Sequence, residues 1–373
     1  MRWDIFCNVV DNFGDIGVSW RLARQLAAEH GAEVRLWVDD LATFRRLAPA
    51  LDPGADMQSL DAIEVRRWFT PFPAVEPGDV VVETFGCELP ASYVEAMAAR
   101  APPPVWVNLE YLSAEPWVGG GHGLPSPHPR LPLTKFFFFP GFASGTGGAL
   151  IEKGLAGRRL EFQSDADGVA RYLASLGVPS RAQGEQLVSL FCYTQSPVAA
   201  LLDAWAGGGR PVRAFAFAGT AVADVLAARG LAGGGRDGAL SAQVLPFLSQ
   251  DDYDRMLWSC DWNFVRGEDS FMRAQLAARP LVWQAYPQAG DAHRLKVEAF
   301  LARYLEHAGP DTGANLTTLW TVWNGFAAVE GLAAAWAACT GPEYLELAQR
   351  WEKRLATPGD LAGNLAKFCS ERL

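Results

Sequence analysis

The sequence alternates short apolar runs with segments of helical spacing, and this alternation constrains the fold more than any other feature. In the first half, the expected strands are Ile5–Val10, Val34–Val38, Val80–Thr84, Val105–Leu109 and Phe136–Phe139. In the second half, they are Leu187–Tyr193, Val212–Phe217, Ala242–Leu245, Trp262–Val265 and Leu281–Gln284. The helices expected between them include Val18–His30, Leu41–Leu47, Pro197–Trp205 and Thr220–Ala228. Such alternation is typical of βαβ units, so the pattern predicts an α/β protein with parallel, doubly wound sheets.

The length of 373 residues favours two domains over one. We place the boundary at Gly177–Ser180, which gives a first domain over residues 1–178 and a second over residues 179–345. Glycine triplets at Gly207–Gly209 and Gly233–Gly235 are expected to be turns. The C-terminal segment, residues 346–373, has helical spacing and is expected to pack back on the first domain.

The composition excludes several classes of protein. A formal net charge of −10 argues against nucleic acid or an anionic membrane as a partner, since binding of phosphate groups draws on clustered Lys and Arg. No apolar stretch reaches the roughly 18–20 residues of a membrane helix, and the N-terminus lacks a signal-peptide pattern. The six cysteines are scattered without a C-x-x-C pair, which favours free thiols and a cytoplasmic protein.

Asp11–Gly17 is the first candidate for a functional site. This glycine-bearing turn follows the first expected strand and opens a helix, an arrangement that often binds phosphate. It holds two carboxylates, Asp11 and Asp15, which would repel phosphate. Thr84–Glu88 and Glu110–Leu112 follow two further strands. Because ligands bind at the carboxyl ends of parallel strands, we expect the three segments to converge.

The segment from Trp117 to Pro129 is rich in glycine, proline and histidine. A long loop of this kind is either a surface linker or a functional loop. Its aromatic and histidine content favours a position near the site.

No metal or nicotinamide site is indicated. The five histidines show no ligand spacing. Asp165 and Asp167 form a D-x-D pattern, but with Ser164 they are better explained as the N-terminal cap of a helix. The turn at Asp11 lacks G-x-G-x-x-G, and no G-x-S-x-G nucleophile motif occurs. We therefore expect a chain that works without a metal or a bound cofactor.

A second polar cluster, Arg266–Phe271, follows the expected strand Trp262–Val265 and opens a helix. Backbone donors at this helix start, with Arg266, suit a diphosphate, although a plain helix cap is an equal alternative. Phe247 and Tyr253 lie upstream and could stack on a base or belong to the core. Tyr286 lies after the next strand.

Three motifs together resemble the bacterial elongation factor P arginine rhamnosyltransferase family. They are Asp11–Arg24, Gly123–Pro129 and Arg266–Phe271, and Tyr286-Pro287-Gln288 fits as well. The resemblance spans almost the whole chain. It implies the GT-B fold, with two facing Rossmann-like domains and a cleft between them. It also implies that the donor substrate is dTDP-β-L-rhamnose and that the reaction needs no metal ion. It also implies transfer of rhamnose, with inversion, to one arginine of elongation factor P.

The resemblance also implies roles for individual residues. Phe247 and Tyr253 would flank the thymine, Gln250 would touch the base, and Glu268 would lie near the ribose or phosphates. The nucleotide diphosphate would be held by Tyr193, Arg266, Asp269, Ser270 and Tyr286. Asp11 and Asp15 would belong to the acceptor side.

The chemistry of arginine explains the two aspartates. A guanidinium is charged and is a poor nucleophile, so carboxylates that grip its N–H groups and accept a proton assist attack. We expect Asp15 to be the general base and Asp11 the positioning carboxylate, although the order could be reversed. Alternatives are a non-catalytic adaptor that binds a nucleotide sugar and a transferase with a small acceptor; a dehydrogenase is a distant third.

Overall fold

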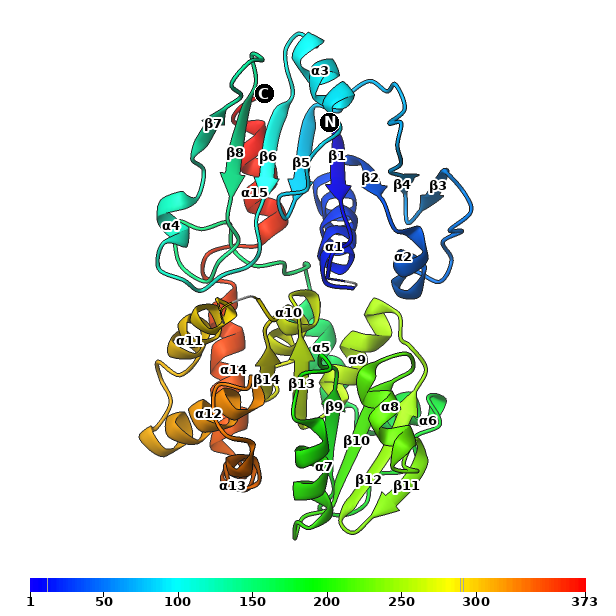
Figure 1. The fold of residues 1–373 in the computed structure, drawn as a ribbon, viewed down its shortest axis with the longest axis vertical. Helices are drawn as coiled ribbons and strands as arrows, with labels where there is room; N and C mark the ends of the chain where they lie inside the picture. The colour runs from blue at the N-terminus through cyan, green and yellow to red at the C-terminus, as the bar shows by residue number, and fades with distance from the viewer. Residues whose placement is uncertain (12, 289, 291) are drawn as a thin grey trace. The chain divides into compact units, whose positions relative to one another are not determined.

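A computed structural model gives the structure of this chain and describes residues 1–11, 13–288, 290 and 292–373. The chain divides into two compact units, which are treated separately below. The first unit contains Met1–Lys153 and Leu355–Leu373, and the second contains Gly154–Arg354. Each unit is a sheet of mostly parallel strands with helices (Figure 1). The predicted α/β class is confirmed.

The sheet of the first unit has β1 and β5 at its centre. Its strand order is β3 (Met57–Leu60), β4 (Ile63–Arg67), β2 (Glu33–Val38), β1 (Arg2–Cys7), β5 (Val80–Thr84), β6 (Val105–Leu109), β8 (Thr134–Phe138) and β7 (Pro125–Pro127). Pairing is parallel except at the two edges, where β3 and β7 run antiparallel to their neighbours. The helices are α1 (Phe13–His30), α2 (Leu41–Leu47), α3 (Ala91–Ala99), α4 (Val118–Gly121) and α15 (Leu361–Ser370).

The sheet of the second unit has β10 and β9 at its centre. Its strand order is β11 (Gly233–Asp237), β12 (Leu240–Leu245), β10 (Val212–Phe217), β9 (Gln186–Leu190), β13 (Trp262–Arg266) and β14 (Leu281–Gln284). β11 is antiparallel to β12, and the other pairings in the described part of this unit are parallel. The helices are α5 (Leu155–Ser164), α6 (Ala166–Ser175), α7 (Val198–Ala206), α8 (Ala221–Ala228), α9 (Gln250–Ser259), α10 (Asp269–Leu276), α11 (His293–Tyr304), α12 (Pro310–Trp323), the short η2 (Val329–Gly331), α13 (Leu332–Ala338) and α14 (Glu343–Leu355).

Several elements have the bounds that the sequence predicts. The bounds of β5, β6, β10, β14 and α2 are those predicted. β1 is displaced towards the N-terminus and ends at Cys7, so residues 8–10 lie in the turn that follows it. Gly233–Gly235, predicted as a turn, belongs to β11, where pairing with β12 overrides the poor strand propensity of glycine. Residues 117–129, predicted as a loop, contain α4 and β7.

The division between the units differs from the predicted boundary at residues 178/179. It lies at residues 153/154, because α5 and α6 pack against α9 of the second unit. Gln163 Nε2 donates to the carbonyl of Trp258 at 3.2 Å, and the Tyr172 hydroxyl donates to the carbonyl of Asp252 at 2.5 Å. These contacts make the helical stretch before Gly177 part of the second unit.

The C-terminal segment also differs from the prediction, because residues 346–373 are not one helix. α14 belongs to the second unit, where the Trp351 indole donates to Gln275 at 2.8 Å. Only α15 returns to the first unit and packs on α1. There Gln25 Nε2 donates to Asp360 at 3.1 Å, and the Phe368 ring meets Phe138 edge-on at 5.4 Å.

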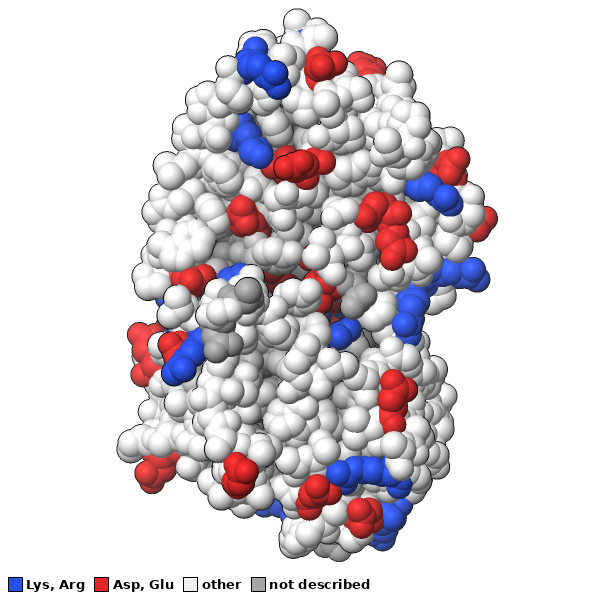
Figure 2. All heavy atoms as spheres, in the orientation of Figure 1, with Lys and Arg blue, Asp and Glu red and all other residues white. Residues whose placement is uncertain are grey.

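The cysteines are free thiols, as their spacing in the sequence led us to expect. All six cysteines are buried with free thiols, and burial raises the pKa of Cys87 to about 12. Acidic and basic side chains are interspersed on the face drawn in Figure 2. In the described part of the chain, no helix combines the length and apolar character needed to cross a bilayer.

Candidate functional site

The turn between β1 and α1 is organised by the carboxylate of Asp15. Asp15 is 1% exposed, and its Oδ2 accepts the backbone N–H groups of Val10 at 2.9 Å and Asp11 at 2.8 Å. Its Oδ1 accepts the Tyr111 hydroxyl at 3.0 Å. A carboxylate has about four lone-pair sites, so these three bonds fix its orientation and leave acceptor capacity on Oδ1.

Asp11 lies in the same turn and is half-buried. Its carbonyl accepts the Gly14 N–H at 2.7 Å, which closes the turn at the start of α1. A Cβ on residue 14 would lie 2.7 Å from Asp11 Oδ2, so the glycine makes room for this carboxylate. The turn thus places two carboxylates within five residues, one buried and fixed and the other at the surface of the turn.

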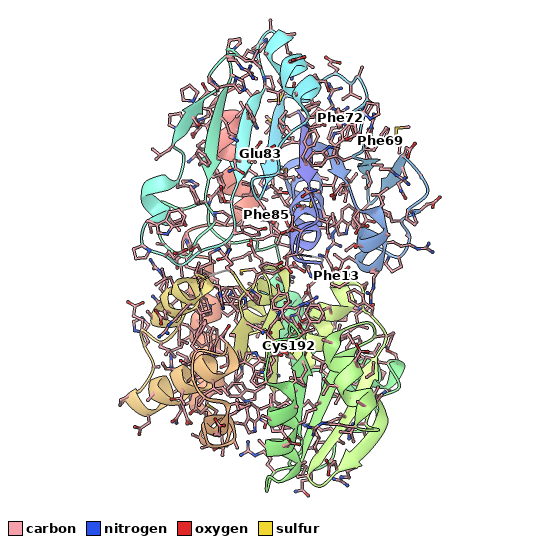
Figure 3. All side chains as sticks on the ribbon, viewed as in Figure 1. Phe13, Phe69, Phe72, Glu83, Phe85 and Cys192 are labelled. Atoms are coloured by element: carbon pink, nitrogen blue, oxygen red, sulfur yellow. The ribbon has the colours of Figure 1, made fainter. Side chains whose placement is uncertain are left out.

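The segment after β5 supports Asp15 through Tyr111. The ring of Phe85 stacks on the ring of Tyr111 with centroids 4.3 Å apart and planes 13° apart. Figure 3 labels Phe85 just beyond β5 and Phe13 at the start of α1. Phe85 has a φ of +60°, a left-handed conformation that is costly for a residue with a bulky side chain. Backbone strain of this kind clusters at functional sites.

The predicted convergence of three segments is confirmed within the first unit. Tyr111 follows β6 and contacts both Asp15 and Phe85. Ser19 of α1 donates to Thr84 at the end of β5 at 3.3 Å. The carboxyl ends of β1, β5 and β6 therefore contribute to one polar cluster, as the topology of a parallel sheet requires.

In the second unit, Arg266 at the end of β13 lies between two aromatic rings. Its guanidinium carbon is 4.6 Å from the centroid of Phe191 and 4.6 Å from that of Tyr193. Stacking on aromatic faces holds a guanidinium in place while its N–H groups remain able to donate. Arg266 is half-buried, so a charged donor is fixed at the carboxyl end of the sheet.

The turn from β13 into α10 is closed by Ser270. Its hydroxyl accepts the backbone N–H of Arg266 at 3.1 Å and donates to the carbonyl of the same residue. Gly267 permits the turn with a φ of +60°. The first helical bond runs from Met272 N to the carbonyl of Glu268 at 2.9 Å. The N–H groups of the first turn of α10 therefore have no acceptor inside the helix, which suits an anion.

Tyr193 and Tyr286 meet near this turn, beyond β9 and β14. Their rings pack edge-on with centroids 5.6 Å apart. The Tyr193 N–H donates to the buried side chain of Gln284 at 2.7 Å, which ties the two strand ends together. Tyr286 is 46% exposed, so much of its ring faces solvent.

Tyr253, Gln250 and Asp269 lie beside the same turn. The half-buried ring of Tyr253 packs on Phe191 and Phe217 at 5.8 and 5.4 Å. Burial, with the charge of Asp269 nearby, raises the pKa of Tyr253. Gln250 Nε2 approaches Asp269 Oδ2 at 3.4 Å.

The remaining predicted residues also belong to the second unit. Phe247 is half-buried between β12 and α9, and Glu268 is half-buried immediately before α10. The predicted nucleotide-sugar residues thus follow β9, β12, β13 and β14, with Arg266 as the last residue of β13.

Asp165 caps a helix, as the sequence favoured. Its Oδ1 accepts the N–H of Gly168 at 2.8 Å at the start of α6. Across the described residues, no group of three or more His, Cys, Asp or Glu side chains is placed to hold a metal ion.

Sequence reasoning did not assign three supporting residues. They are Tyr111, which holds Asp15, Phe191, which stacks on Arg266, and Gln284, which holds Tyr193. All three lie at or just beyond the carboxyl end of a parallel strand, and this position is the signal that points to them.

Comparison with known proteins matches the whole length of the chain. Residues 3–370 match the family described as Elongation-Factor P (EF-P) rhamnosyltransferase EarP. A protein-arginine rhamnosyltransferase of Pseudomonas aeruginosa is 49% identical over 100% of this chain and 99% of its own length. A protein of the same description from Shewanella oneidensis is 38% identical, with 98% of this chain and 97% of the relative covered.

Two solved structures are similar to this chain over almost its whole length. One described as "Structural basis for EarP-mediated arginine glycosylation of translation elongation factor EF-P" is 36% identical, with a TM-score of 0.69, and covers 100% of this chain and 99% of that chain. Acinetobacter baumannii MurG is 12% identical with a TM-score of 0.54, and covers 99% of both chains. At that identity the likeness to MurG concerns the fold alone.

Proposed function

We propose the substrates of this chain, which belongs to the elongation factor P rhamnosyltransferase family. The chain is a protein-arginine rhamnosyltransferase of the GT-B fold. The donor is dTDP-β-L-rhamnose, and the acceptor is one arginine of translation elongation factor P. Transfer inverts the anomeric configuration and needs neither a metal nor a bound cofactor. Because the acceptor is a translation factor, the reaction takes place in the cytoplasm.

The observation that carries the proposal is the fixed carboxylate of Asp15 beside Asp11. Three hydrogen bonds orient Asp15, with acceptor capacity left on Oδ1. Asp11 offers a second carboxylate to the N–H fork of an arginine. A terminal nitrogen of the guanidinium attacks the anomeric carbon, its proton passes to Asp15, and the bond from that carbon to the diphosphate oxygen breaks.

The second unit supplies the groups suited to the departing nucleotide. Arg266 and the N–H groups at the start of α10 offer positive charge to the diphosphate as it gains charge. These groups perform the task that a metal ion performs in other transferases. Phe247 and Tyr253 would flank the thymine and Gln250 would touch the base. Glu268 would contact the ribose or phosphate region.

Tyr193, Asp269, Ser270 and Tyr286 complete the proposed donor site around the diphosphate. Ser270 already closes the turn through Arg266, so its hydroxyl acts first by fixing that turn. One displacement at the anomeric carbon, without a covalent enzyme intermediate, gives inversion.

Intact-mass analysis of the acceptor tests the proposal. The protein is incubated with elongation factor P and dTDP-β-L-rhamnose in the presence of EDTA. A gain of one deoxyhexose supports the donor, the acceptor and metal independence together. No gain with or without EDTA would contradict the proposed substrates, and a gain abolished only by EDTA would contradict metal independence. NMR of the product then gives the anomeric configuration, and retention would contradict the single displacement.

A further inference from the structure

The second unit contains a cavity at the amino ends of its strands, at the edge of the sheet opposite Arg266. The cavity has a volume of about 310 Å³. Its charged lining residues are Arg181, Glu185, Arg210, Asp261 and Arg279. Glu185 immediately precedes β9, Asp261 immediately precedes β13, and Arg279 lies just before β14. Because a five-residue strand spans roughly 16 Å, this cavity is separate from the candidate donor site.

The acids that line the cavity are already paired. Asp261 Oδ2 accepts from Arg181 at 2.5 Å and from the backbone N–H of Leu187 at 2.8 Å. Glu185 accepts from Arg213 at 2.8 and 3.0 Å, and also from the N–H of Ala182 at 3.0 Å. Each carboxylate is therefore neutralised by an arginine of its own.

Two arginines at the cavity remain without such a partner. Among the described residues, no carboxylate forms an ion pair with Arg279 or Arg210, and the buried Nε of Arg279 has no hydrogen-bond acceptor. Burial lowers the pKa of Arg279; the charges of Arg181 and Arg159 act in the same direction, and the charge of Asp261 opposes them. A buried guanidinium donor without an acceptor is costly. The cavity therefore has excess positive charge in a chain whose net charge is −10.

We propose that this cavity binds a small phosphate-bearing anion through Arg279 and Arg210. The planar fork of a guanidinium matches two oxygens of a phosphate, and Arg279 and Arg210 both line the cavity. The volume suits a small molecule. The site lies at the start of β13 and β14, the strands that end near Arg266 and Tyr286. An anion bound here stabilises the sheet that carries the candidate donor site.

Calorimetric titration of the full chain with inorganic phosphate, at an ionic strength held constant with chloride, tests the proposal. The Arg266→Gln variant is titrated in parallel, because the candidate donor site is also suited to an anion. Saturable binding is expected in the wild type and in Arg266→Gln. Arg279→Gln and Arg210→Gln are expected to weaken it by roughly tenfold or more, as the loss of a charge-assisted bond implies.

Arg229→Gln is the matched control. This arginine belongs to the same unit and pairs with Asp203 at 2.6 Å, outside the cavity, so phosphate affinity is expected to remain at the wild-type value. If Arg279→Gln does not fold, judged by circular dichroism, the exposed Arg210 decides the test. Absence of saturable binding, or equal affinity in wild type and Arg210→Gln, would overturn the proposal. Loss of binding in Arg266→Gln alone would assign the phosphate to the donor region instead.

Discussion

The hydroxyl of Tyr111 donates to Oδ1 of Asp15 at 3.0 Å, and this bond joins the end of β6 to the turn after β1. The ring of Tyr111 is itself held by Phe85, whose backbone adopts a left-handed conformation. The orientation of the proposed base therefore depends on segments almost one hundred residues away in the sequence. Tyr111 is a positioning residue in this account, because it acts through Asp15.

Tyr111→Phe is expected to lower kcat by roughly tenfold, since one hydrogen bond to a charged group is lost. The ring and its stacking on Phe85 are retained, so stability and nucleotide affinity are expected to change little. Steady-state kinetics and calorimetry with dTDP separate these effects. A kcat equal to that of the wild type would show that this bond does not orient the base.

Phe247→Ala is expected to weaken dTDP binding by about 1–3 kcal/mol, as the loss of base stacking implies. Phe247→Leu serves as the control, because it retains apolar volume but has no aromatic face. Calorimetry gives both affinities. If both variants bind dTDP as the wild type does, the Phe247 ring belongs to the core rather than to the site.

Arg266→Lys is expected to weaken dTDP binding roughly tenfold while leaving the fold intact. Lysine retains the charge but loses the planar fork and the stacking between Phe191 and Tyr193. Calorimetry measures the affinity, and circular dichroism checks the fold. Unchanged affinity would place the diphosphate away from Arg266.

His122 gives a prediction for the pH dependence of stability. Burial lowers the pKa of His122, and its Nδ1 accepts the N–H of Phe139 at 3.1 Å. In the unfolded chain the pKa is about 6.5. Between the two values the unfolded chain binds more protons, so the free energy of unfolding decreases as the pH falls below about 6.5.

Urea unfolding, carried out at about pH 7.5 and about pH 5.5, measures how much His122 contributes to this loss of stability. Wild type is expected to lose more stability on acidification than His122→Gln, whose side chain does not titrate. An equal loss in both proteins would show that other groups account for the acid sensitivity of the first unit.

Much of the fold could be predicted from local patterns. The strands β5, β10 and β14 are mostly apolar and largely buried, and their bounds are those predicted. β11 could not be predicted in this way, because its glycines favour a turn until β12 provides a pairing partner. The unit boundary depends on the packing of α5 on α9, a contact between residues about one hundred positions apart.

The candidate site was predictable in its residue types but not in its internal connections. The two carboxylates of the first turn are visible in the sequence, as is the order of strand, glycine and helix around Arg266. The sequence does not show that Asp15 is buried and accepts a hydrogen bond from Tyr111, or that Ser270 is hydrogen-bonded to the backbone of Arg266. These connections arise from the register of neighbouring strands, which only the assembled sheet determines.

Tandem mass spectrometry of elongation factor P tests whether the carboxylate turn activates an acceptor arginine. Wild type, Asp15→Asn and Asp11→Asn are each incubated with dTDP-β-L-rhamnose and the acceptor, and dTDP affinity is measured in parallel. We predict one deoxyhexose on a single arginine with the wild type. Asp15→Asn is expected to lower the rate by about 10²–10⁴-fold, the typical contribution of a general base, with dTDP affinity unchanged. A modified arginine formed by Asp15→Asn at the wild-type rate, or no modified arginine with the wild type, would contradict the account.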